Sequence, residues 1–193
     1  MIVNIPSDII ISNVKITHNI PNFKTESMNL TERTKSRGIH RLEGTLDINI
    51  GGSIKAEKAW NAFLVSVQGS YNEFELELPL HFVSENIDTN PICPDTILIG
   101  SNQMILNGFT DEVYAGSCFN FDNDSKIYYT KNTVKSGEVV EFFPAARVQQ
   151  LQNTTIEFIR PKILARFTKD DQPIDFTEAG KVIKVSMDWK EAL

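Results

Sequence analysis

Alternation of apolar and polar residues predicts a strand over 41–50. Four apolar positions alternate there with four polar ones: Leu42, Leu46, Ile48 and Ile50 against Glu43, Thr45, Asp47 and Asn49. A period of two is typical of a strand with one buried face and one wet face. Gly51 and Gly52 end the strand, and Ser53 is a good candidate for a helix N-cap.

The next segment changes to helical spacing. Its apolar residues recur three and four positions apart: Ala56, Ala59, Trp60, Phe63, Leu64 and Val67. This spacing predicts an amphipathic helix with one apolar stripe, and Gly69 is available as its left-handed stop. The stripe explains Trp60 as a core residue without a ligand.

Four further segments favour extended structure. Residues 8–22 are β-branched and end at Pro21, and residues 72–82 alternate up to Pro79, which stops pairing or marks an edge. Residues 156–167 contain Pro161, which implies a bulge or an edge, and residues 180–190 alternate again. These long strands predict one discontinuous, mainly β domain over 1–83 and 154–193.

The middle of the chain, 84–153, differs in character. It has short apolar runs at 96–99, 103–106, 112–114, 117–121, 126–130 and 138–143, separated by turn signals such as Asn107-Gly108 and Ser136-Gly137. Short strands with such turns predict a small antiparallel barrel, inserted into the first domain.

The densest basic cluster lies at the end of a polar, aperiodic stretch over 23–38. It consists of Arg33, Lys35, Arg37 and Arg41. A charge run of this kind is typical of a solvated loop, and the alternative is an arm that contacts a partner.

Composition limits the function classes. The net charge of −6 and the pI near 5.1 argue against a protein that grips nucleic acid mainly by neutralising phosphates. Two cysteines, Cys93 and Cys118, form neither a disulfide framework nor a four-ligand zinc site, which favours a reducing compartment during assembly. No secretion signal or bilayer-spanning run occurs, so we expect a soluble, non-secreted protein.

Candidate chemistry is sparse. His18, His40 and His81 lie in different elements without a nucleophile beside them, and DNDSK (122–126) lacks the closing Glu of a calcium loop. We therefore expect no catalytic residue, no metal and no cofactor. An aromatic set in the barrel, Phe119, Phe121, Tyr128 and Tyr129, is either core or an exposed stacking face.

Three stretches together resemble the distal tail proteins, and similar minor tail proteins, of long-tailed bacteriophages. The first is 36–69, with Trp60, Phe63, Leu64 and Gly69 in place, and with Leu42 where the family often has Trp. The second is 114–147, with the residues Ala115, Gly116, Phe119, Lys126, Tyr128 and Phe142 to Pro144. The third is the closing segment 184–193.

The resemblance implies a fold and a structural role. The fold is a β-sandwich or split-barrel domain with one short helix, carrying an inserted OB-like barrel. The role is a ring, hexameric in the family, that joins the tail tube to the baseplate hub at the tail tip of the virion, after synthesis in the host cytoplasm. Arg33, Lys35, Arg37 and Arg41 are the expected contacts with an adjacent subunit or the tube, and no membrane or specific nucleic acid is an expected partner.

Two other functions stay open. The first is an OB-type module that binds single-stranded nucleic acid or an oligosaccharide over Phe119, Phe121, Tyr128 and Tyr129. The second is a hydrolytic tail enzyme, which the sequence favours least because no nucleophile–base pair or carboxylate pair stands out.

Overall fold

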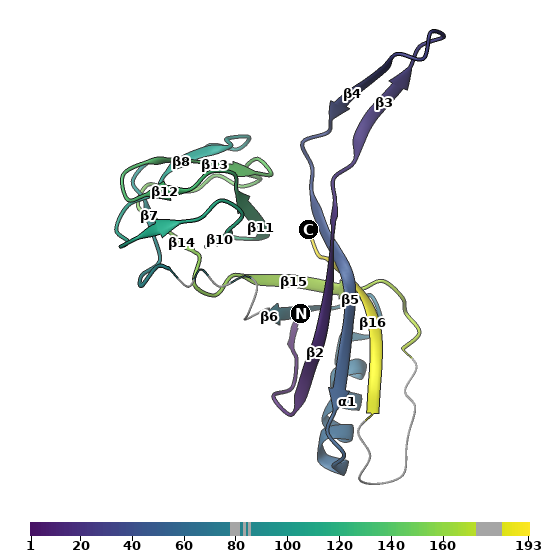
Figure 1. Ribbon diagram of the computed structural model, residues 1–193. Coiled ribbons are helices and arrows are strands. Elements are labelled where there is room, and N and C mark those ends of the chain that lie inside the picture. The colour runs from purple at the N-terminus through teal and green to yellow at the C-terminus, as the bar shows by residue number, and fades with distance from the viewer. Residues whose placement is uncertain (78–81, 83, 85, 173–182) are drawn as a thin grey trace. The chain divides into compact units, whose positions relative to one another are not determined.

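A computed structural model describes residues 1–77, 82, 84, 86–172 and 183–193. Within them the fold is mainly β, with one helix, two six-stranded sheets and two two-stranded sheets (Figure 1). The chain divides into two compact units. Unit 1 consists of 1–19, 41–76 and 164–193, and unit 2 consists of 20–40 and 77–163. The mainly β class with an inserted small antiparallel barrel is confirmed.

Unit 1 is a six-stranded sheet with one helix. The strand order is β1-β6-β15-β16-β5-β2. The bounds are β1 Ile2–Asn4, β2 Ile9–Asn19, β5 Arg41–Ile50, β6 Glu73–Glu77, β15 Lys162–Phe167 and β16 Ile183–Glu191. Strands β1 and β6 run parallel, whereas β5 is antiparallel to both β2 and β16.

The alternation predicted for β5 is confirmed. Leu42, Leu46, Ile48 and Ile50 are buried, and the residues between them are only partly exposed. Strand β16 repeats the pattern, with every second residue from Ile183 to Glu191 buried. The two strands therefore turn one face toward a shared core.

Helix α1 (Ile54–Val67) begins and ends close to where the sequence predicts. Ser53 accepts a hydrogen bond from the Ala56 amide at 3.2 Å, and the left-handed stop begins one residue early, at Gln68. The Trp60 ring stacks on Phe63, with 5.2 Å between centroids. Trp60 is thus a buried core residue, as expected.

Gly44 marks the closest backbone approach in the sheet. A Cβ atom placed there would lie 1.8 Å from the carbonyl oxygen of Lys15 in the paired strand β2. The indole nitrogen of Trp189, opposite Gly44 on β16, would be 3.2 Å away. Only glycine fits between these groups.

Unit 2 contains a nearly closed antiparallel barrel of order β7-β14-β10-β11-β13-β8. Its strands are β7 Ile92–Cys93, β8 Gln103–Ile105, β10 Cys118–Phe121, β11 Asp124–Thr130, β13 Val139–Phe143 and β14 Thr154–Glu157. The two edges meet where Ile92 and Asn107 exchange backbone hydrogen bonds of 2.8 and 2.9 Å. A separate ribbon pairs β9 (Glu112–Val113) with β12 (Val134–Lys135).

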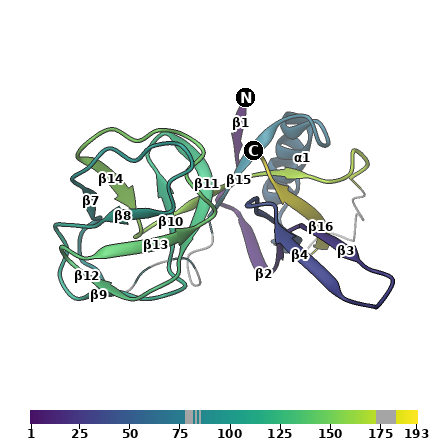
Figure 2. The ribbon, with the colours of Figure 1, turned by 90° about the horizontal axis from the view of Figure 1, so that it is seen from above.

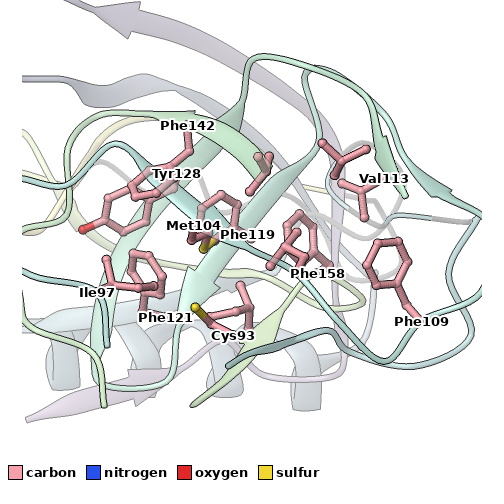
Figure 3. Packing of buried hydrophobic residues seen from close by; sticks show 14 of the residues in the cluster. Cys93, Ile97, Met104, Phe109, Val113, Phe119, Phe121, Tyr128, Phe142 and Phe158 are labelled. Carbon is pink, nitrogen blue, oxygen red and sulfur yellow. The ribbon is translucent and has the colours of Figure 1, made fainter. Parts of the chain in front are cut away.

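Aromatic rings fill the barrel. Phe119 lies within 5.7 Å of the ring centroids of Phe121, Tyr128, Phe142 and Phe158. Figure 3 shows these side chains gathered between the strands. Edge-to-face and offset contacts at this spacing stabilise a core beyond the area that they bury.

Some boundaries differ from the pattern-based ones. Strand β14 pairs with β7 and β10, so the barrel extends through 163 rather than ending at 153. The run 96–99 is not a strand, because only Ile97 forms an isolated bridge, to Gln150. Leu78, Pro79 and 180–182, which the pattern also assigns to strands, lie outside the described residues.

The chain enters and leaves the barrel at neighbouring points of the first sheet. Strands β6 and β15 are adjacent in the first sheet. An ion pair of 3.3 Å joins Glu77, at the end of β6, to Lys162, at the start of β15. A second pair joins Glu73 to Arg166 at 2.6 Å, so the two strands run antiparallel.

The expectation that the basic run forms a loop is wrong, although the run from Glu32 to Ser36 is solvent-exposed as expected. Strands β3 (Asn22–Glu26) and β4 (Glu32–Ser36) pair there as an antiparallel hairpin (Figure 1). The sequence hides this hairpin because neither face carries an apolar row, so the period-two signal of a half-buried strand is missing.

Candidate functional site

The segment 22–39, hereafter the hairpin arm, is the most exposed part of the described chain. Every residue in it is exposed, including all ten residues of β3 and β4. The ladder runs from Asn22 opposite Ser36 to Glu26 opposite Glu32. The arm is therefore held by backbone pairing and not by a core of its own.

The turn of the arm closes around Ser27. The Ser27 amide donates to the Thr31 carbonyl at 3.1 Å, and the Leu30 amide donates back to the Ser27 carbonyl at 2.9 Å. Leu30 adopts a left-handed backbone with φ of 61°. Met28 and Leu30 point large apolar side chains into solvent, and Leu30 is 80% exposed. Two large apolar side chains are thus exposed at the tip of the arm.

Strand register gives the arm two unlike faces. Directly opposed residues of an antiparallel pair lie on the same face. Phe23 opposes Lys35 and Thr25 opposes Arg33, so these four residues share one face. The guanidinium of Arg37 lies over the Phe23 ring, 4.4 Å from its centroid. This cationic face (Phe23, Thr25, Arg33, Lys35, Arg37) contains no carboxylate.

The opposite face has the reverse balance. Lys24 pairs with Glu32 at 3.5 Å, and Glu26 lies opposite Glu32. Over 22–39, four basic side chains against two acidic ones give +2, so the remainder of a chain with net charge −6 carries −8. In the described chain neither Arg33 nor Lys35 has an ion-pair partner, so the cationic face is free to bind an acidic surface.

Arg41, grouped with the arm by sequence, has a different environment. It lies on β5, where its Nε donates to Glu43 Oε1 at 2.8 Å. The Asn19 amide also donates to Glu43, and this hydrogen bond, assisted by Arg41, lowers the pKa of the Glu43 carboxyl despite partial burial. Arg41 is therefore committed to an intramolecular ion pair.

The aromatic set of the barrel does not form an exposed stacking face. Phe119, Phe121 and Tyr128 are buried, and Tyr129 is partly buried. The Tyr128 hydroxyl donates to Asp124 at 2.6 Å and accepts from the Arg147 amide at 3.2 Å. Burial raises the pKa of Tyr128, so its hydroxyl stays a donor.

The two described histidines and the Cys118 thiol do not come together as a catalytic or metal site. His18 is exposed on β2, and His40 is buried at the end of the arm against Tyr129, with 5.6 Å between ring centroids. His81 lies outside the described residues. Burial raises the pKa of the Cys118 thiol to about 12, which keeps it protonated. Among described residues, no group of three His, Cys, Asp or Glu side chains could hold a metal ion.

Comparison with known proteins adds no neighbour. No model of a known protein family matches the sequence, and no curated protein matches it. Within the described chain, no helix is long and apolar enough to cross a membrane.

Sequence reasoning found the basic cluster but not its geometry. It could not separate Arg41 from the other three cations, because that separation depends on where β4 ends and β5 begins. Phe23 is a second omission. The available signal was that Phe23 and Lys35 are about equally far from the turn at 27–31, which is weak without a structure.

Proposed function

We propose that the protein is a structural subunit of a phage tail tip, where copies form a ring that joins the tail tube to the baseplate hub. The observation that carries this proposal is the hairpin arm, a fully exposed hairpin with a cationic face and apolar residues at its turn. The proposed ring holds each arm against a neighbouring copy.

The energetics of the arm favour such a contact. An isolated two-stranded hairpin is only marginally stable in water, because it buries too little apolar surface to offset chain entropy. Docking against a second copy would bury Met28, Leu30 and Phe23, which are exposed in the single chain. Since the rest of each copy carries −8, the cationic face meets a complementary charge on its neighbour.

The outer strand of unit 1 offers a second contact. Strand β2 is 11 residues long and lies at the edge of its sheet, so one side of its backbone has no strand beside it within the described chain. Long edge strands readily pair with another chain. A head-to-tail contact of this type closes into a ring when the rotation between neighbouring copies is a simple fraction of a full turn, and the proposed ring needs such a rotation.

The resemblance of 36–69, 114–147 and 184–193 to distal tail proteins supports the same role and suggests six subunits. It also names the two partners of the proposed ring, the tail tube protein and the baseplate hub protein.

Assembly is tested by measuring the mass of the purified protein, alone and with tube protein, together with its symmetry in electron-microscope projections. We expect a closed ring for the wild type. The triple reversal Arg33→Glu, Lys35→Glu and Arg37→Glu should leave folded monomers, because it places negative charge against an acidic neighbour. Raising the salt concentration should weaken assembly of the wild type.

A charge-matched pair of milder variants isolates the cationic face. Arg33→Gln with Lys35→Gln lowers the charge by two on that face, and Asn22→Asp with Thr34→Glu lowers it equally on the opposite face. Only the first pair should impair assembly. A strictly monomeric wild type, or a triple reversal that assembles normally, would contradict the proposal.

A further inference from the structure

The surface of unit 2 has a hollow of about 520 Å³, lined by Asn86, Asp111, Glu112, Tyr114 and Lys135. Its volume falls within the range of about 300–1,000 Å³ that is typical of small-ligand sites. Tyr114 is 55% exposed and lies beside four hydrogen-bonding side chains in the described lining. The hollow thus combines one apolar ring face with several polar groups.

One wall of the hollow is held firmly by the barrel core. Val113 of β9 opposes Val134 of β12, and both are buried in the core. Strands β9 and β12 lie side by side in Figure 2. Glu112 and Lys135 are the next opposed pair on this ribbon, and an ion pair of 3.2 Å joins them. Because side chains alternate along a strand, the valines fix the ribbon while the charged pair faces the hollow.

The loops that supply the other side chains are tied together. Asp88 accepts a hydrogen bond from the Thr110 hydroxyl at 2.8 Å, and the Thr89 hydroxyl donates to the Gly108 carbonyl at 2.9 Å. These bonds join the loop that carries Asn86 to the loop that carries Asp111. The Tyr114 backbone is fixed as well, because its carbonyl accepts from the Thr130 hydroxyl at 2.8 Å. The hollow is therefore formed before any ligand arrives.

We propose that this hollow binds a neutral oligosaccharide. A sugar ring presents an apolar face, which suits the exposed Tyr114 ring, and a rim of hydroxyls that both donate and accept hydrogen bonds. Asp111 and Glu112 accept from hydroxyl groups, Lys135 donates to them, and the Asn86 amide does both.

The charge of the lining selects against nucleic acid. Among the described lining residues, two carboxylates and one ammonium give a net charge of −1, so a phosphate backbone would meet repulsion. The site is separate from the buried set Phe119, Phe121 and Tyr128, and it involves no residue of the hairpin arm. The proposal therefore holds or fails independently of ring assembly.

Saturation-transfer NMR on the full-length protein tests the inference. The probes are maltotetraose, cellotetraose, mannotetraose and chitotetraose at millimolar concentration, with a thymidine oligonucleotide as the anionic comparison. At least one sugar should bind, and Tyr114→Ala should weaken that binding about tenfold through loss of ring stacking. Asp111→Asn should weaken it about threefold, since Asn keeps the hydrogen-bonding shape and tolerates the left-handed backbone at this position.

Tyr71→Ala serves as the matched control, because Tyr71 is an exposed tyrosine of unit 1 that does not line the hollow. Its binding should equal that of the wild type. The proposal is overturned if no sugar in the panel binds, if the oligonucleotide binds instead, or if Tyr114→Ala binds as well as Tyr71→Ala. Circular dichroism of each variant shows whether lost binding reflects lost folding.

Discussion

The strand pairs β2–β5 and β3–β4 use the same antiparallel ladder, but they differ in what their side chains bury. In β5 the apolar residues from Leu42 to Ile50 face a core, whereas every residue of β3 and β4 is exposed. The first pair gains its stability from burial within the chain. The second has no such source, so its stable form depends on what it contacts.

Under the proposed ring assembly, this difference assigns folding and association to different parts of the chain. Substitutions in β5 should act on the folding of a single copy, and substitutions in the hairpin arm should act on association. The predictions below test that division, starting with the largest expected effect on folding.

Gly44→Ala should have the largest effect. The added methyl group would lie 1.8 Å from the Lys15 carbonyl oxygen, so β2 must move away from β5 and lose ladder hydrogen bonds. We expect the free energy of unfolding to fall by about 4 kcal/mol or more, measured by urea denaturation. Gly51→Ala is the control, because a Cβ there meets nothing within 4 Å, and its stability should change little. A Gly44→Ala protein of wild-type stability would refute the close packing of β2 on β5.

The unfolding free energies of Leu46→Ala and Leu30→Ala compare the two strand pairs directly. Leu46 is fully buried on β5, and its truncation should cost about 2–5 kcal/mol of unfolding free energy. Leu30 is 80% exposed at the turn of the hairpin arm, so its truncation should change monomer stability by less than about 0.5 kcal/mol. Thermal unfolding at a concentration that keeps the protein monomeric gives both values. Similar losses for the two variants would mean that the arm has a core within its own chain.

The smallest effect is expected from removing an ion pair, Arg41–Glu43 in β5 or Lys24–Glu32 in the hairpin arm. Hydrogen bonds from Asn19 and Arg41 lower the pKa of Glu43, so the charged carboxylate stabilises the fold above its unfolded pKa of about 4.3, and this stability is lost as the pH falls through the lower folded pKa. Glu43→Gln should therefore be less stable than wild type at neutral pH by less than about 1 kcal/mol, and the difference should disappear once the pH falls below the lowered folded pKa.

Glu32→Gln provides the matched control on the hairpin arm. The Lys24–Glu32 pair is well exposed, so its loss should leave monomer stability almost unchanged. Urea denaturation of both variants across the acid range checks the pair of expectations. An equal pH dependence of wild type and Glu43→Gln would show that the Asn19 and Arg41 contacts contribute nothing.

The predictable parts of the fold are those with a buried face. Strand β5 and helix α1 were predicted nearly to the residue, because Leu46 and Trp60 each belong to a periodic apolar row that reports burial. The turn signals of the barrel are also local, and Gly108 and Gly137, which belong to two of them, have the positive φ that glycine favours.

The remaining features lack a local signal. The hairpin arm has no buried row, so its polar residues suggested a loop. The sequence placed 154–157 with the first domain, because the apolar residues of 156–167 do not reveal which partner strands they meet; β14 pairs with β7 and β10 instead. Aromatic content alone left a core and a stacking face both open, and the burial of Phe119 and Tyr128 decides for the core.

The proposed oligosaccharide site could not be predicted from the sequence either. Asn86, Tyr114 and Lys135 are far apart in the sequence, and none belongs to a spaced motif. Their convergence depends on how β9 pairs with β12, which only the three-dimensional structure provides.

The ion pair between Glu77 and Lys162 shows that the two ends of the barrel insertion lie next to each other, which bears on how the protein could evolve. Because the ends of β6 and β15 are neighbours, a tight turn could join them in place of the whole barrel. The barrel is then an exchangeable module, and lineages could gain, lose or replace it while keeping the same host sheet. Engineers could use the same junction to graft a foreign domain onto this scaffold.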